Sequence, residues 1–369
     1  MTIAAEAAPA VAMYGLPSDL ALPDAPLSDE EFGELFDRCE DDRLVGLLAA
    51  AVRDGALQVS DTARDTLEEE WQRWLAHDLR IERLLLDTLH ELAGAGIPAR
   101  VLKGVALAHT AYTDPALRVF GDADVLVPGP HFTRAAALLA ARLDARRYLP
   151  ELRPGFDDRF GKEVMLRVAL DSGPLELDLH RVFVDGAFGL TIDVDDLFAP
   201  PYRFALGSFE LEALPMPQRL LHACYVAALG DWPPRLMAQR DLVQIVVREQ
   251  PNLVDVLLMA RRWRCETVVA RAVTDTWAIL RPQARPPIVE WAARYEPSRT
   301  DRFLFGAHRG PARAITRHAA AVVVLPDVSS RAAYLHAVAF PQREYLEVRG
   351  SSTVQHLRRA SRRLVWRKP

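Results

Sequence analysis

Apolar residues follow a helical spacing at both ends of this chain and a strand-like alternation in its middle. Over residues 61–95 they recur every three or four positions, which predicts one long helix. Ser28-Asp-Glu-Glu31 is a capping box and predicts the start of an earlier helix, which carries Phe32 to Leu44. The helical spacing returns after Pro215, where helices are predicted at residues 218–229, 236–248, 253–263, 266–280, 299–305, 312–323, 331–339 and 354–367.

The middle of the chain alternates short apolar runs with short helical segments. Strands are predicted at residues 99–102 and 119–127, each followed by a helix, and hairpins are predicted within 162–181 and 204–214. This order indicates an α+β fold, with a small mixed sheet flanked by helical modules. The predicted parts are a mobile tail (1–26), an N-terminal helical module (27–98), an α+β core (99–214) and a C-terminal helical domain (215–369).

Composition narrows the class of protein. The chain has 369 residues, 50% of them hydrophobic, and its net charge of −5 provides no basic field for nucleic acid. No apolar run approaches the ~20 residues of a membrane span, and the N-terminus lacks the pattern of a signal peptide. Three isolated cysteines form no CxxC pair, which suggests a reducing compartment. We therefore expect a cytoplasmic protein that binds neither membranes nor nucleic acid.

The cations are strongly biased toward arginine, which lowers the weight that an arginine cluster deserves. Lysine occurs only at Lys103, Lys162 and Lys368. A lysine in such a chain is informative, because lysine and arginine are not interchangeable around phosphates.

One short apolar strand carries an Asp-x-Asp pair, Asp122 and Asp124. Residues two apart on a strand point to the same face, so both carboxylates project together while Val125 and Val127 face the other side. Adjacent carboxylates repel each other unless a cation lies between them, and a hard divalent ion such as Mg²⁺ suits that role. A solvated strand end is the alternative, and the pair alone does not decide between them.

A second strand alternates in the same way, in the run Leu175-Glu-Leu-Asp-Leu-His-Arg181. Glu176, Asp178 and His180 share its polar face. One interpretation is the wet face of an antiparallel sheet, which is common. The other is that Asp178 joins the Asp-x-Asp pair as a third carboxylate, as two-metal phosphoryl transfer requires.

The ordered set of a Lys-Gly step, a lone arginine, Asp-x-Asp and Asp-Leu-His resembles the uncharacterised nucleotidyltransferase family of the DNA-polymerase-β-like superfamily. Similar positions after the sheet extend the resemblance over roughly residues 80–365. It implies a nucleotidyltransferase core with metal carboxylates on adjacent strands. The residues concerned are Asp122, Asp124 and Asp178 for metal and catalysis, Lys103, Gly104 and Arg118 for phosphate, and His180 and Glu176 in supporting positions.

The chain departs from the superfamily at its first motif. Lys103-Gly104 replaces the usual Gly-Ser, and Asp122 follows Gly104 by 18 residues. The start of a helix at Gly104 still offers backbone N–H groups to a phosphate, and Lys103 adds a positive charge.

The activity implied is Mg²⁺-dependent nucleotidyl transfer, with Mn²⁺ as the alternative ion. A nucleoside monophosphate would move from an NTP such as ATP to a hydroxyl or phosphate on a small molecule or peptide, with release of pyrophosphate. A metal-dependent kinase is a second hypothesis, because the same charges suit phosphoryl transfer. A non-catalytic adaptor that reuses the fold for binding is a third, although three carboxylates that repel one another argue against it.

Overall fold

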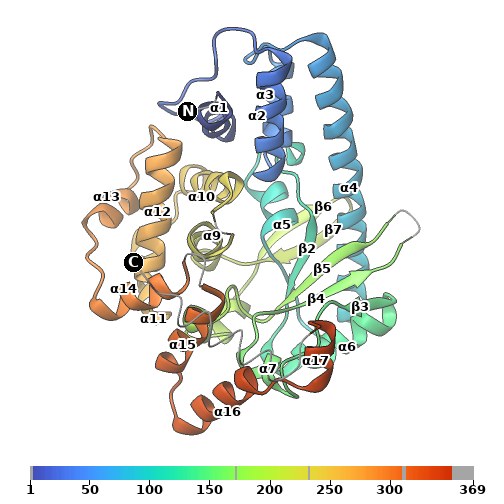
Figure 1. The fold of residues 1–369 in the computed structure, drawn as a ribbon, viewed down its shortest axis with the longest axis vertical. Helices are drawn as coiled ribbons and strands as arrows, with labels where there is room; N and C mark the ends of the chain where they lie inside the picture. Colours follow the sequence, from blue (N-terminus) through green and yellow to red (C-terminus); the bar gives the residue numbers. More distant parts are fainter. Residues whose placement is uncertain (1–2, 171–172, 232, 310–312, 351–369) are drawn as a thin grey trace.

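A computed structural model describes residues 3–170, 173–231, 233–309 and 313–350. Its centre is a seven-stranded mixed sheet with helices before and after it along the chain (Figure 1). The strand order is β3-β4-β5-β2-β1-β7-β6, where the bounds in chain order are β1 Arg100–Val101, β2 Asp122–Leu126, β3 Ala145–Arg147, β4 Glu163–Val168, β5 Leu175–His180, β6 Tyr202–Leu206 and β7 Phe209–Ala213. The α+β fold class predicted from the sequence is confirmed.

The two strands that carry Asp-x-Asp and Asp-Leu-His are neighbours near the middle of the sheet. β2 and β5 pair in parallel, and β1 pairs antiparallel with β2 and parallel with β7. The remaining neighbours pair antiparallel, as in the predicted hairpins β4–β5 and β6–β7. Parallel neighbours require a long connection, and here the chain between β2 and β5 supplies it.

Helices precede, interrupt and follow the sheet. In chain order they are α1 Ile3–Ala12, α2 Asp29–Asp41, α3 Val45–Arg53, α4 Asp61–Gly94, α5 Lys103–Thr110, α6 Phe132–Arg142, α7 Phe156–Phe160, α8 Ala187–Leu190, α9 Gln218–Leu229, α10 Leu236–Glu249, α11 Leu253–Arg262, α12 Glu266–Leu280, α13 Pro287–Arg294, α14 Arg299–Ala307, α15 Arg313–Val324, α16 Val328–Ala339 and α17 Arg343–Val348. Short 3₁₀ turns lie at η1 Pro115–Leu117, η2 Gly129–His131 and η3 Asp195–Phe198.

Helices α4 and α6 cover one face of the sheet. Leu85 of α4 and Leu139 of α6 belong to one hydrophobic cluster with Val125 of β2 and Leu179 of β5. Because side chains alternate along a strand, this packing leaves the opposite face of β2 and β5 to their polar side chains.

The N-terminal region differs from the prediction at two places. Residues 3–12, expected in a mobile tail, form α1, whose buried alanines and Val11 pack with α2, α10 and α12. Alanine favours helix strongly, and its small side chain allows close packing without a marked apolar stripe.

The capping box is confirmed, because Ser28 Oγ accepts a hydrogen bond from Glu31 N. Helix α2 ends at Asp41, before Leu44, which was predicted to belong to it. The backbone then turns through Arg43 (φ 62°) into the separate helix α3.

Most helices predicted after the sheet are present. Those predicted at residues 218–229 and 266–280 have the same bounds as α9 and α12, whereas α13 and α17 were not predicted. The predicted helix over residues 354–367 lies outside the described residues.

One hydrophobic cluster contains side chains of α1–α3 together with those of α9, α10 and α12. The division of the chain into four parts stays a prediction.

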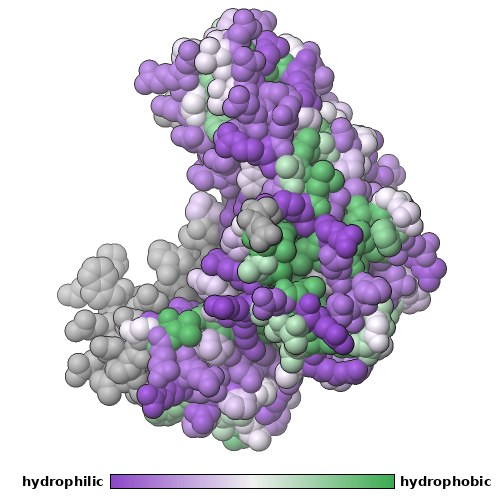
Figure 2. All heavy atoms as spheres, turned by 90° about the vertical axis from the view of Figure 1, so that its right-hand side faces the viewer, coloured by the Kyte–Doolittle hydropathy of each residue, from purple (hydrophilic) through white to green (hydrophobic). Residues whose placement is uncertain are grey.

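The face seen in Figure 2, which includes α4, is mostly hydrophilic, with hydrophobic side chains gathered near its middle. Helix α4 is 34 residues long and charged along its length. Among the helices that the structure describes, none combines the length and the apolar character of a bilayer-spanning segment.

Candidate active site

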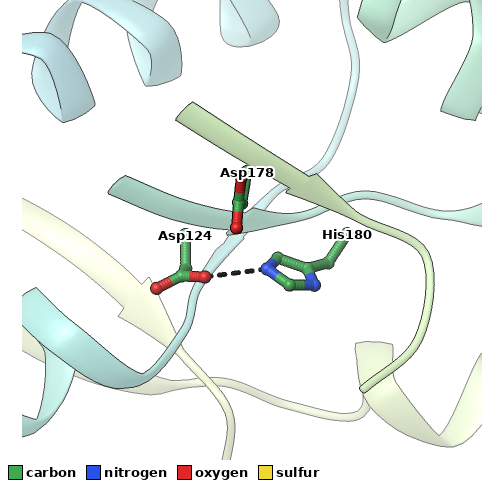
Figure 3. A group of neighbouring side chains, drawn as sticks. All are labelled: Asp124, Asp178 and His180. Atoms are coloured by element: carbon green, nitrogen blue, oxygen red, sulfur yellow. Dashed lines mark hydrogen bonds and ion pairs between the residues drawn. The ribbon is translucent and has the colours of Figure 1, made fainter. Parts of the chain in front are cut away.

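The parallel pairing of β2 with β5 brings the two acidic motifs together. In this register Asp124 lies opposite Asp178, and Asp122 lies opposite Glu176. The polar side chains of both strands therefore project from one face of the sheet, as the alternation predicts. Figure 3 shows Asp124, Asp178 and His180 pointing toward one another from the two strands.

Asp124, Asp178 and His180 form a buried group that can hold a metal ion. Their ligand atoms all lie within 4.8 Å of one another. His180 Nε2 is 2.8 Å from Asp124 Oδ1, and since a carboxylate only accepts, Nε2 donates this hydrogen bond. Asp124 Oδ2 and Asp178 Oδ1 are buried and have no hydrogen-bond partner among the residues that the structure describes. Two such carboxylate oxygens are costly to bury unless a cation contacts them, so the residues fit a divalent ion.

Asp122 lies at the edge of this group. Its side chain is 33% exposed, whereas that of Asp124 is 1% exposed. Lys103 Nζ is 2.9 Å from Asp124 Oδ1 and 3.7 Å from Asp122 Oδ2. The ammonium group of Lys103 therefore offsets the repulsion between the two carboxylates of the Asp-x-Asp pair.

The buried charges shift one another's pKa values in opposite directions. Burial alone would raise the pKa of Asp124, but the ammonium of Lys103 and the hydrogen bond from His180 outweigh it and hold this pKa well below its usual range. No cation in the described part of the chain forms an ion pair with Asp178, and burial together with the nearby carboxylate of Glu163 raises its pKa to about 7. The pKa of Asp178 thus lies well above that of Asp124, and pKa values that the surroundings drive apart are typical of functional sites.

The structure adds two residues that the sequence did not point out. Lys162 and Glu163 stand at the start of β4, where Glu163 pairs with His180 in the strand register. His180 Nδ1 is 3.3 Å from Glu163 Oε2, and Lys162 Nζ is 2.5 Å from the same oxygen. The rarity of lysine in this chain was the one available signal for Lys162.

Arg118, predicted to contact phosphate, forms a buried ion pair with Asp241. Its Nη2 is 2.8 Å from Asp241 Oδ2, and its Nε is 3.3 Å from Asp241 Oδ1. Tyr112 Oη donates to the same carboxylate at 2.7 Å. The phosphate role of Arg118 stays a prediction, because the charge of its guanidinium is already balanced.

Gly104 and Glu176 also border the site. Gly104 is the second residue of α5, next to Lys103, and is buried. Glu176 is 44% exposed at its side chain and is 3.4 Å from Arg167. The supporting position predicted for Glu176 is thus at the rim, opposite Asp122.

A cavity of about 380 Å³ lies above this face of the sheet. It is lined by Lys103, Asp122 and Asp124 of the core, by Arg43 from the N-terminal helices and by Arg235 from the C-terminal ones. A second cavity of about 240 Å³ shares Lys103 and contains His180 and Lys162. The two cavities therefore share Lys103 as a lining residue.

Sequence comparison finds a match to a protein family. A family model described as "Uncharacterised nucleotidyltransferase" matches residues 28–278, more than half of the chain. The match begins before the expected extent of about 80–365 and includes Arg43, and it ends before residue 365. No curated protein matches the sequence.

Among solved structures, an antigenic nucleotidyltransferase-like protein from Paracoccidioides brasiliensis is similar to part of this chain. The sequence identity is 12%, and the superposition covers 56% of this chain and 93% of that chain with a TM-score of 0.34. A superposition at that score carries no argument about this site.

Proposed function

Because this chain belongs to the uncharacterised nucleotidyltransferase family, we propose that it transfers a nucleoside monophosphate from an NTP to an acceptor. The acceptor is a hydroxyl or phosphate group on a small molecule or peptide, and pyrophosphate is released. The observation that carries the proposal is the pair of buried, unpartnered oxygens on Asp124 and Asp178, on neighbouring strands. A protein that only binds a partner has no need for two such oxygens.

The proposed ligands of Mg²⁺, or of Mn²⁺, are Asp124 and Asp178, with Asp122 as the third carboxylate. His180 orients Asp124 through its hydrogen bond, and its other ring nitrogen lies 3.3 Å from Glu163 Oε2. Supporting contacts of this kind fix the orientation of metal-binding side chains. When bound, the metal neutralises phosphate charge and lowers the pKa of an attacking hydroxyl.

The proposed phosphate contacts are Lys103, the N–H groups at Gly104 and Arg118. Lys103 balances the Asp-x-Asp pair in the free protein. Asp122 and Asp124 would hold a divalent cation that supplies the positive charge Lys103 supplies in the free protein, and the ammonium of Lys103 would then contact the phosphates of the NTP. This exchange would keep the charge of the site balanced before and after the nucleotide binds.

In the proposed reaction the acceptor oxygen attacks the α-phosphorus, and the bond from that phosphorus to the pyrophosphate oxygen breaks. The proton of the acceptor passes to Asp178. Asp178 lies opposite Asp124 on the neighbouring strand, which would place it beside the acceptor as a general base. Lys103 stabilises the negative charge that develops on the leaving pyrophosphate.

The test is incubation with each of the four NTPs and Mg²⁺, with pyrophosphate release measured in the presence and absence of candidate acceptors. Asp124→Ala and Asp178→Ala are expected to abolish turnover, whereas Asp24→Ala, at an exposed position, is expected to leave it unchanged. Wild-type turnover in Asp124→Ala would overturn the metal assignment.

The product mass separates the reaction classes. A nucleotidyl adduct supports the proposal, and a phosphate adduct would indicate a kinase instead. A protein that binds no NTP in the presence of Mg²⁺ or Mn²⁺ would be an adaptor that reuses the fold.

A further inference from the structure

Four cationic side chains line the larger cavity, and three of them are already paired with an acid. Lys103 contacts Asp124, Arg118 is clamped by Asp241, and Arg235 Nε is 3.1 Å from Asp231 Oδ2. The fourth is Arg43. Within the described part of the chain, its guanidinium forms neither an ion pair nor a hydrogen bond, and it stacks only on an aromatic ring.

The backbone that carries Arg43 is held firmly in place. Arg43 adopts a left-handed conformation (φ 62°) in the short turn between α2 and α3, which costs a non-glycine residue roughly 1–2 kcal/mol. Its neighbour Asp42 is buried and accepts a hydrogen bond from Leu236 N at 2.9 Å, at the start of α10. Leu44, on the other side, is fully buried. The turn is therefore anchored at both sides of Arg43.

The guanidinium is also positioned by its surroundings. Its Cζ lies 4.5 Å from the centre of the Trp74 ring on α4. A Cβ placed on Gly121 would lie 2.9 Å from Arg43 Nη2, so this glycine leaves room for the guanidinium beside the start of β2. Gly121 directly precedes Asp122, and the free cation therefore lies close to the acidic motif.

We propose that Arg43 binds the polyphosphate of the NTP, so that the N-terminal helices complete the nucleotide site. This inference rests on the proposed function and adds a residue outside the family motif that the sequence suggested. A planar guanidinium presents paired N–H donors that match phosphate oxygens. Stacking on Trp74 fixes the plane of the group before the ligand arrives, which reduces the entropy lost on binding.

The charge around Arg43 supports an anionic ligand. Burial and the neighbouring cation Arg235 lower the pKa of Arg43, and Asp122 only partly opposes them. A phosphate in the cavity would relieve this unfavourable environment for both arginines. Arg118 has less to gain, because Asp241 already neutralises it.

The experiment measures binding of inorganic tripolyphosphate with Mg²⁺ by calorimetry, which avoids the unknown base preference. Arg43→Met is expected to weaken binding ~10–100-fold, the usual effect of losing a charge-assisted hydrogen bond or two. Arg43→Lys keeps the charge without the planar fork and should show a smaller loss. Arg73→Met is the matched control, because Arg73 is exposed, lines a neighbouring pocket together with Arg43 and pairs with Glu70.

A second variant disturbs Arg43 without changing any charge. Gly121→Ala places a methyl group against the end of the flexible Arg43 side chain, which can move aside at little cost to folding. We expect weaker tripolyphosphate binding and a reduced dependence of binding on salt. The double variant Arg43→Met/Gly121→Ala should bind no more weakly than Arg43→Met alone, because both changes remove one contact.

The outcomes separate this inference from the proposed function. Equal binding by the wild type and Arg43→Met would overturn the role of Arg43 and leave the proposed reaction standing. Weaker binding by Arg43→Met in a protein that transfers no nucleotide would support the anion contact and contradict the reaction. A wild type that binds neither tripolyphosphate nor any NTP would overturn both.

Discussion

Replacing Asp178 with asparagine is expected to stabilise the metal-free protein, and by more at pH 8 than at pH 5. Burial raises the pKa of Asp178 from 3.8 to about 7 in the folded state, and the carboxylate of Glu163 adds to this effect. The folded protein therefore keeps a proton that the unfolded chain releases near pH 4. Between these two pKa values the wild type loses stability as the pH rises, and above the higher value the loss is complete.

The size of the effect follows from the pH window. Each pH unit between the two pKa values removes ~1.4 kcal/mol of the free energy of unfolding. Between pH 5 and pH 8 the wild type should therefore lose ~2–3 kcal/mol through Asp178 alone. Asparagine has nearly the same shape and carries no charge to desolvate, so Asp178→Asn should gain that amount relative to the wild type.

The assay is urea denaturation in the presence of EDTA at pH 5, 6, 7 and 8, followed by tryptophan fluorescence. Titrating groups that do not interact with Asp178, such as Asp78, whose pKa burial raises to about 8, are common to both proteins and cancel in the difference. Asp24→Asn removes an exposed carboxylate and serves as the control. Saturating Mg²⁺ or Mn²⁺ at pH 8 should stabilise the wild type and have less effect on Asp178→Asn.

A difference between Asp178→Asn and the wild type that stays constant from pH 5 to pH 8 would refute this reasoning. It would mean that Asp178 is solvated in the folded protein. The group formed with Asp124 and His180 would then lose its main argument as a metal site.

Three further predictions concern a buried ion pair, the packing of two glycines and the burial of the cysteines. Arg118→Met is expected to lower the free energy of unfolding by ~3–5 kcal/mol, because it leaves Asp241 buried without its partner, and a loss under 1 kcal/mol in urea would contradict this. Gly46→Ala is expected to cost at least ~1–3 kcal/mol, since its Cβ would lie 2.3 Å from Ala116 O. Gly33→Ala, in the open middle of α2, should instead stabilise by ~0.5–1 kcal/mol, and equal melting temperatures for the two variants would be inconsistent with both. All three cysteines are buried, and burial raises the pKa of their thiols, so a thiol reagent should label them in denaturant and not in the native protein; rapid native labelling would contradict their burial.

Local spacing was sufficient for many of the helices. The bounds of α9 and α12 follow from apolar side chains at helical intervals between strong breaks, and both helices were predicted to the residue. Helix α1 was missed because its alanines carry little amphipathic signal, although tertiary packing buries them. The turn at Arg43 was missed because a left-handed conformation is normally signalled by glycine or asparagine, and this turn uses an arginine instead.

The faces of the strands were also readable from local pattern. Alternation places Asp122 with Asp124, and Asp178 with His180, whichever strands lie beside them. Burial, however, is not a local property. The ligand atoms of Asp124, Asp178 and His180 lie within 4.8 Å of one another and are buried, whereas the side chain of Asp122 lies nearer to solvent.

The sequence by itself therefore determined the fold class, the two acidic strands and the side of each strand on which its carboxylates lie. Only the tertiary structure decided that β2 and β5 are parallel neighbours with Asp124 opposite Asp178. It also brought Arg43 and Lys162, from distant parts of the chain, to the same cavities as Lys103. The physical reason is that strand pairing and cavity lining depend on backbone hydrogen bonds and packing between distant segments, which leave no periodic trace in the local sequence.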